Sequence, residues 1–297
     1  MSGSGRTAIA AREGYAFLLP WLVGIIGLTG GPALFSLYLS FTKYDLVTDP
    51  QWVGAANYVR IATADPKFWI AMKVTFTYIF LAVPLKLTFA LSIAMLLNKG
   101  LRGLPIYRAL FYLPSLLGGS VAIAILWRNM FSAGGLFNKI LAIVGIQGIG
   151  WVTTPETALY TLVLLTIWQF GSPMIIFLAG LRQIPHDMYE AASMDGASPR
   201  RQFFKITLPL LTPVIFFNVI VQTIDAFKAF TSSFIISNGT GGPINATLFY
   251  TLYLFQEAFA YFRMGYAAAL AWVLVLIIAS FTGVSFLMSR YWVHYDD

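Results

Sequence analysis

The sequence predicts an all-α membrane protein with six transmembrane helices. Of its 297 residues, 58% are hydrophobic and only 10% are charged, and the mean hydropathy is +0.75. Soluble domains carry about 25% charged residues, so this chain has too little polar surface for a soluble globule. Six apolar segments are also long enough to cross a bilayer, which takes roughly 20 residues. We therefore expect lipid to surround most of the chain.

The apolar segments divide the chain into two short tails and one domain. A single transmembrane domain is expected over residues 15–289, between an N-terminal tail, 1–14, and a C-terminal tail, 290–297. The first apolar run is longer than the hydrophobic region of a signal peptide, and no small-residue cleavage site stands out, so we interpret it as an uncleaved span. The six spans are expected at residues 15–41, 70–97, 107–127, 157–180, 208–236 and 265–289.

Basic residues indicate which side of the membrane holds the termini. An even number of spans places both termini on one side, and cytoplasmic segments are enriched in Lys and Arg. The side of the termini carries ten basic residues in short segments, whereas the other side carries seven in longer ones. Both termini are therefore expected in the cytoplasm, and this topology explains the net charge of +7 better than a nucleic-acid partner does. The ten are Arg6, Arg12, Lys99, Arg102, Arg108, Arg182, Arg200, Arg201, Lys205 and Arg290.

A polar island separates the fourth and fifth spans. It begins at Glu190 and reads EAASMDGASPRRQFFKITLP, which is too polar to lie in lipid. Gly196 can adopt the left-handed conformation that ends a helix. Ser198 can cap a following helix, and Pro199 suits its first position. The loop at residues 181–207 is therefore predicted to form two short helices joined at a glycine.

Polar residues also lie within the fifth span. Asn218, Gln222 and Asp225 are spaced at i, i+4 and i+7, so they share one helix face, which Ala229 continues. A charge near the centre of a span costs ~2.5–3.5 kcal/mol on insertion scales. This stripe therefore predicts the lining of a hydrophilic path. Lys228 leaves open the alternative that Asp225 belongs to a purely structural ion pair.

The fourth span adds Trp168, Gln169 and Ser172, although Trp168 also suits ordinary packing. Amides and carboxylates bind hydroxyl groups, and aromatic rings stack on sugar rings. The combined lining therefore fits a neutral, hydroxyl-rich ligand, because an anion would need more than the single lysine on the fifth-span stripe. Lys86, in the second span, is expected to snorkel or to pair with a neighbouring chain.

The sequence carries no motif of an enzyme. It has no GxxxxGK[ST] phosphate-binding loop, no HExxH motif and no nucleophile elbow. It has no cysteine and only two histidines, His186 and His294, which lie far apart, so no metal cluster is expected. Any ATP must therefore be hydrolysed by another chain.

The segments outside the predicted spans suggest further elements. Residues 42–69 are expected to form an external loop, and residues 128–156 a short surface helix with a return turn. The apolar, aromatic stretch at residues 248–262 is expected to lie on the membrane surface before the last span.

The polar island carries a family resemblance. Its spacing is E-A-A, three residues, G, nine residues, I-x-L-P, and it resembles the cytoplasmic coupling loop of permease subunits in binding-protein-dependent ABC importers. From LFSLYLSFTKYD to GYAAALAWVLVLI, nearly the whole chain is similar to permeases of carbohydrate ABC importers, the group that includes the maltose-system larger permease. The resemblance implies the type I ABC importer (MetI-like) architecture in a bacterial or archaeal cytoplasmic membrane. The seven matching positions are Glu190, Ala191, Ala192, Gly196, Ile206, Leu208 and Pro209.

The resemblance also implies partners and roles. A second, different permease chain, two ATP-binding subunits that hold ATP and Mg²⁺, and a soluble solute-binding protein would complete the importer. The coupling element that enters an ATPase cleft would comprise Glu190, Ala191, Ala192, Asp195 and Gly196. The substrate pathway would comprise Trp168, Gln169, Ser172, Asn218, Gln222, Asp225, Ala226 and Ala229.

Two other functions remain open from the residues. A secondary transporter would use Asp225 and Lys228 as a proton relay and need no ATPase. An ABC importer of glycerol phosphate, a polyamine or a peptide would use the same loop. A membrane scaffold without a pathway is disfavoured by the polar stripe.

Overall fold

The computed structural model describes residues 17–100 and 103–294. The predicted tail at 1–14 and the basic residues Arg6, Arg12 and Arg102 lie outside the described residues, as do the last three residues of the predicted tail at 290–297. The chain divides into two compact units, one of residues up to Asp65 with Leu254–Val275 and one of Pro66–Tyr253 with the residues from Leu276 onward.

Among the described residues, three helices are each long and apolar enough to cross a membrane. They are Phe17–Ser40, α4 (Pro66–Leu97) and α16 (Met264–Ser289), and they match the first, second and sixth predicted spans. The first of them contains a π-helical segment, η1 (Gly24–Gly30), followed by α2 (Gly31–Ser40). None of its best spanning window is buried within the protein, as expected for a helix that faces lipid.

The other three predicted spans are bent helix pairs. The bend is 94° between α5 (Leu104–Leu117) and α6 (Val121–Met130) and 44° between α8 (Pro155–Trp168) and α9 (Gly171–Leu181). It is 64° between the helical segment Pro199–Leu210 and α13 (Thr212–Phe227). Residues 17–100 and 103–294 thus contain up to six spans if each bent pair counts as one.

Continuous helices across residues 107–127 and 208–236 do not form. Between α5 and α6, the pair Gly118–Gly119 precedes Ser120, which has an extended backbone and accepts a hydrogen bond from the Ile123 N–H at 3.3 Å. Ser120 therefore caps a new helix. In the fifth segment, α13 ends at Phe227 and α14 (Thr231–Ile236) follows after a break.

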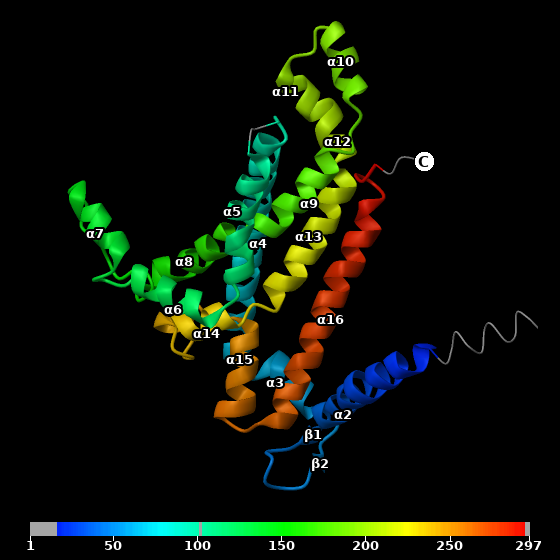
Figure 1. Ribbon diagram of the computed structural model, residues 1–297. Helices are drawn as coiled ribbons and strands as arrows, with labels where there is room; N and C mark the ends of the chain where they lie inside the picture. Colours follow the sequence, from blue (N-terminus) through cyan, green and yellow to red (C-terminus); the bar gives the residue numbers. More distant parts are fainter. Residues whose placement is uncertain (1–16, 101–102, 295–297) are drawn as a thin grey trace, which may run out of the picture. The chain divides into compact units, whose positions relative to one another are not determined.

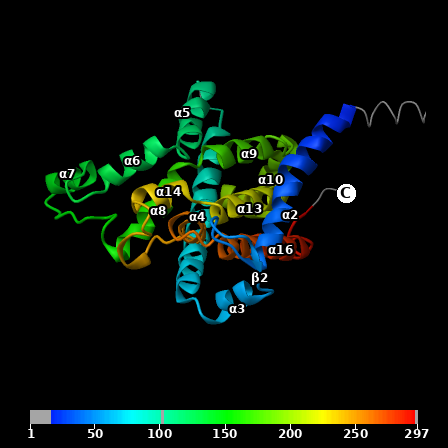
Figure 2. The ribbon, with the colours of Figure 1, turned by 90° about the horizontal axis from the view of Figure 1, so that it is seen from below.

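The larger unit is organised around α4. Helices α8, α9 and α13 pack against α4, α5 packs against α9, and α14 packs against α6 (Figures 1 and 2). Helix α9 approaches α5 closely, because a Cβ atom on Gly171 would lie only 2.4 Å from the Phe111 carbonyl oxygen. This contact holds the start of α9 against the second half of α5.

The stretch at residues 248–262 corrects a prediction. It contains α15 (Tyr250–Phe255) and the π-helix η4 (Gln256–Ala260). Within the larger unit, Phe249, Tyr250 and Tyr253 are at most 1% exposed, and the Tyr250 N–H donates to Thr75 Oγ1 of α4 at 2.8 Å. These aromatic side chains are core residues, so the expectation that this part lies on the membrane surface is wrong.

The segment at residues 128–156 forms the expected short helix and return turn. Helix α7 (Leu136–Ile143) is followed by a chain that folds back on it. Asn138 ties the two parts together, because its Nδ2 donates to the Ile149 carbonyl at 2.7 Å and its Oδ1 accepts from Trp151 Nε1 at 2.6 Å. The short 3₁₀ helix η3 (Pro243–Asn245) lies in the glycine-rich turn after α14.

The smaller unit holds the predicted external loop. Strands β1 (Thr42–Lys43) and β2 (Gln51–Trp52) pair antiparallel, with Thr42 opposite Trp52, and α3 (Ala56–Thr63) follows. In the loop of this hairpin, Asp45 Oδ1 accepts a hydrogen bond from the Thr48 backbone N–H at 2.9 Å. This hydrogen bond contributes most to lowering the pKa of the Asp45 carboxyl. Tyr266 donates to the Asp65 carboxylate and fixes α16 to the end of α3 within this unit.

Candidate functional site

The polar island forms the two predicted helices. Helix α10 (His186–Met194) is followed by a turn at Gly196, whose φ of +74° is the left-handed conformation. The Ala197 N–H donates to the Ala192 carbonyl at 2.9 Å and the Gly196 N–H to the Ser193 carbonyl at 3.0 Å. This pair of bonds is a Schellman motif, so the glycine turn predicted from the sequence is confirmed.

A second helical segment follows the glycine turn. Ser198 Oγ caps α11 (Pro199–Gln202) by accepting from the Arg201 N–H at 3.4 Å, as predicted. The π-helix η2 (Phe203–Thr207) and α12 (Leu208–Leu210) continue it without a break. Together, residues 186–207 form two adjacent helices, which we call the knuckle (Figure 1).

Side-chain hydrogen bonds hold the two helices of the knuckle together. Gln202 Nε2 donates to Ser193 Oγ at 2.9 Å, and the Tyr189 and Thr207 hydroxyls lie 2.8 Å apart. Four hydrogen-bonding side chains from opposite helices therefore close the knuckle into one compact body. A compact body can pass a force from one end to the other without first unfolding.

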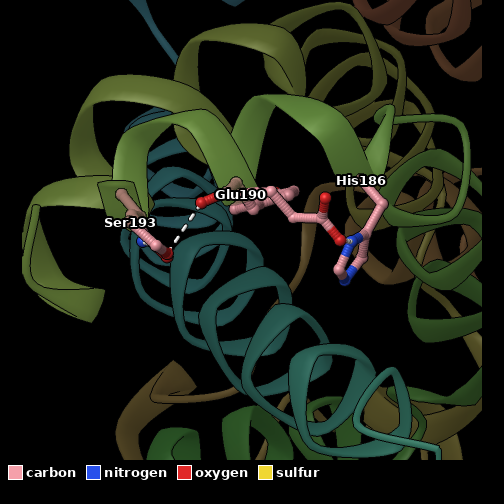
Figure 3. Close-up of polar contacts among 5 residues, drawn as sticks. His186, Glu190 and Ser193 are labelled. Carbon is pink, nitrogen blue, oxygen red and sulfur yellow. Dashed lines mark hydrogen bonds and ion pairs between the residues drawn. The ribbon is translucent and has the colours of Figure 1, made fainter. Parts of the chain in front are cut away.

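The outer face of the knuckle is exposed. No residue of α10 or α11 is buried, and Met194 is 89% exposed. His186 Nδ1 lies 3.0 Å from Glu190 Oε1, one helical turn away, and both side chains are open to solvent (Figure 3). Ala191 and Asp195 are also exposed, while Ala192 is half-buried. The face predicted to contact an ATPase is thus uncovered in this chain.

The knuckle joins α13 through a bend instead of a straight helix. Leu211 lies between the segment Pro199–Leu210 and α13, at the 64° bend. Leu211 is 1% exposed and packs with Val214 against Gly180 of α9, where an added Cβ would lie within 2.9 Å of both side chains. The packing of Leu211 and Val214 on α9 therefore fixes this bend.

A cavity of about 270 Å³ lies at the other end of α13. Tyr78 and Lys86 of α4 line one side of it, and the break between α5 and α6 contributes Gly118 and Ser120. The residues of the predicted pathway that line this cavity are Gln169, Gln222, Asp225, Ala226 and Ala229. Polar side chains from four separate segments thus meet in one cavity of a largely apolar chain.

Three residues of the predicted pathway do not line the cavity. Trp168 lies beside Trp127, with ring centroids 6.0 Å apart and ring planes tilted by 37°. The Ser172 backbone N–H donates to Ser115 Oγ at 3.0 Å. Asn218 is fully buried, and its Nδ2 donates to the Val214 carbonyl of its own helix at 3.0 Å. All three make contacts within the protein instead.

Charged groups in the cavity were only partly predicted. Lys228 Nζ lies 3.2 Å from Asp225 Oδ1, so the ion pair that the sequence left open does form. The sequence did not place Lys86 in this cavity. Its position near the middle of a span was the available signal, because ionisable groups at that depth usually serve a function.

Gln169 links the breaks of two bent spans. Its Nε2 donates to the Gly118 carbonyl at 3.1 Å, and its own carbonyl accepts from Ser115 Oγ at 3.0 Å. Both carbonyls lie where a helix ends, so neither has its usual helical partner. A Cβ on Gly118 would lie 2.2 Å from the Gln169 side chain, so only glycine permits this approach. Gln169 therefore fixes the geometry of the cavity wall.

Gln169→Leu should destabilise the protein by removing the donor to the Gly118 carbonyl. A single such hydrogen bond contributes about 0.5–1.5 kcal/mol, so we expect the melting temperature of the detergent-solubilised complex to fall by a few degrees. Gln183→Leu, on the exposed end of the same fourth segment, is the matched control and should leave that temperature unchanged. Equal melting temperatures for both variants would refute the role of Gln169.

Comparisons with known proteins show which family the chain resembles. A family described as "binding-protein-dependent transport system inner membrane component" matches residues 74–292, which include the cavity and the knuckle. The chain is 56% identical to the probable ABC transporter permease protein YesP of Bacillus subtilis, over 100% of this chain and 99% of that one. It is 35% identical to the lactose transport system permease protein LacF of Rhizobium radiobacter, over 94% of each chain.

Two further comparisons cover nearly the full length. The trehalose/maltose transport system permease protein MalF of Thermococcus litoralis is 33% identical over 95% of each chain. The crystal structure of a bacterial ABC transporter involved in the import of the acidic polysaccharide alginate shares the fold, with a TM-score of 0.79, 21% identity, and coverage of 96% of this chain and 97% of that one. This chain therefore belongs to the family of inner membrane components of binding-protein-dependent transport systems.

Proposed function

We propose that this chain is a permease subunit of an ATP-driven ABC importer that translocates a sugar or oligosaccharide. The observation that carries the proposal is the cavity, where the amides of Gln169 and Gln222 and the carboxylate of Asp225 face one space. These groups are the ones that hydrogen-bond sugar hydroxyls. Relatives named for lactose, trehalose/maltose and arabinooligosaccharide transport support the same cargo class.

The proposed importer contains further chains. Because this sequence has no phosphate-binding loop, two partner subunits hold ATP and Mg²⁺. A second, different permease completes the pathway, and a soluble binding protein delivers the sugar. The solved structure of a similar bacterial alginate ABC transporter is a complex with an alginate pentasaccharide-bound periplasmic protein, which supports the role of the binding protein. The excess of basic residues on the knuckle side supports a cytoplasmic position for both termini.

The knuckle is the proposed coupling element. Its exposed face, with Glu190, Ala191, Ala192, Asp195 and Gly196, enters a cleft of an ATPase subunit. When the ATPase subunits approach each other, they move the knuckle as one body. The packed bend passes that motion to α13, which carries Gln222 and Asp225 at its other end. Hydrolysis outside the membrane thereby changes the cavity inside it.

Gly196→Pro should uncouple ATP hydrolysis from transport. Proline fixes φ near −65°, which is incompatible with the +74° of Gly196, so the two helices of the knuckle lose their relative orientation. We expect loss of substrate-stimulated ATPase activity and of uptake in proteoliposomes, while the protein still inserts in the membrane. Glu190→Lys, which reverses the charge on the exposed face, should have the same effect.

Gly145→Pro is the matched control for this experiment. Gly145 has a φ of +77° at the end of α7 and, like Gly196, has open space around it. It lies outside the knuckle, so its replacement should strain the backbone equally without uncoupling transport. Coupled transport that survives Gly196→Pro and Glu190→Lys would rule out the knuckle as the coupling element.

The cargo is tested by uptake into proteoliposomes that contain the complete importer and its binding protein. A panel of labelled saccharides, peptides, polyamines and glycerol phosphate is offered with ATP or with a proton gradient alone. We expect ATP-dependent accumulation of saccharides only. Uptake driven by the proton gradient would instead indicate a secondary transporter. Uptake of a peptide, a polyamine or glycerol phosphate instead of saccharides would contradict the proposed cargo class.

A further inference from the structure

The charged groups of the cavity do not balance. Its lining contains the ammonium groups of Lys86 and Lys228 but only one carboxylate, that of Asp225. Lys228 and Asp225 form an ion pair at 3.2 Å, with side chains 58% and 60% exposed. Lys86, from the neighbouring helix α4, lines the same cavity. The lining thus holds two ammonium groups and one carboxylate, and the cavity carries one excess positive charge.

An excess charge at this depth requires an explanation. Placing an ionised side chain in a span costs ~2.5–3.5 kcal/mol on insertion scales. A neutral sugar can accept a hydrogen bond from a second lysine, but amides and a carboxylate already supply donors and acceptors for its hydroxyls, and the excess charge stays unbalanced. An anionic ligand gains a hydrogen bond in which donor and acceptor are both charged, and it also balances the excess charge. The excess lysine therefore points to an anionic cargo.

The single excess positive charge of the lining indicates which kind of anion fits the cavity. A phosphate ester carries about −1.5 to −2 charges at pH 7, which exceeds the single positive charge of the lining. A carboxylate carries one. Gln169, Gln222 and Asp225 meanwhile remain suited to hydroxyl groups. The lining thus matches a molecule that has many hydroxyls and one carboxylate.

We propose, on the basis of the saccharide transport proposed above, that the cargo is an acidic saccharide whose uronate carboxylate binds Lys86. Gln169 and Gln222 bind its hydroxyls, and the ion pair with Lys228 holds the Asp225 carboxylate in place. Lys86 is thereby a specificity-determining residue. Its charge on α4 and the amides on the facing segments discriminate a uronate from the corresponding neutral hexose.

The test uses disaccharides that differ only at C6, one set as neutral hexoses and the other as uronates. ATP-driven uptake of both sets is measured in proteoliposomes with the complete importer and its binding protein. We expect uptake of the uronates by the unaltered protein. Lys86→Gln should lower their uptake at least tenfold, whereas Lys86→Arg should retain most of it. Lys73→Gln, an exposed lysine on the same helix outside the cavity, is the control and should change nothing.

The possible results separate the two proposals. Uptake of neutral disaccharides alone, or unchanged uronate uptake by Lys86→Gln, would overturn the assignment of an acidic cargo and leave saccharide import intact. An equal loss of neutral and acidic uptake by Lys86→Gln would show that this lysine supports assembly, and would also overturn the assignment. ATP-dependent uptake of neither set, with uptake of a peptide or polyamine instead, would overturn both proposals.

Discussion

The structure depends on how this chain satisfies polar groups where its spanning helices break. Within a bilayer no water is available for unpaired backbone groups, so irregular backbone is tolerated only where protein or a water-filled cavity surrounds it. At the meeting of two breaks, Gln169 supplies a donor to the Gly118 carbonyl and Ser115 supplies one to the Gln169 carbonyl. The same breaks leave room for the cavity. The helix breaks thus explain both the hydrogen bonds to the unpaired carbonyls and the space for a ligand.

The cavity and the knuckle lie at opposite ends of one chain segment. From the Schellman turn at Gly196, the path runs through Pro199–Leu210 and the packed bend at Leu211 to α13, which ends beside Lys228. Packed elements have few alternative arrangements, so a displacement at one end is passed on instead of being absorbed. We infer that this segment is the mechanical link of the proposed importer.

Local features were predictable from the sequence, whereas long-range ones were not. The turn at Gly196 and the cap at Ser198 follow from residues within a few positions, so both were predicted correctly. The bend at Leu211 depends on packing against α9, and hydropathy alone does not reveal such a contact. Lys86 reaches the cavity because α4 packs against α13, which one-dimensional spacing cannot show. Asn218 lies one helical turn before Gln222, but it is fully buried and does not line the cavity.

The coupling role of the knuckle is tested most directly by measuring which side of the membrane it faces and which protein it contacts. The chain has no cysteine, so Met194→Cys, at a position 89% exposed, gives it a single thiol. Val47→Cys, at a position 90% exposed in the hairpin of the smaller unit, is the control. With a membrane-impermeant maleimide, Met194→Cys should react only from the cytoplasmic side, and a maleimide-to-amine cross-linker should join it to an ATPase subunit. Reaction of Met194→Cys from outside, or no cross-link to that subunit, would contradict the account.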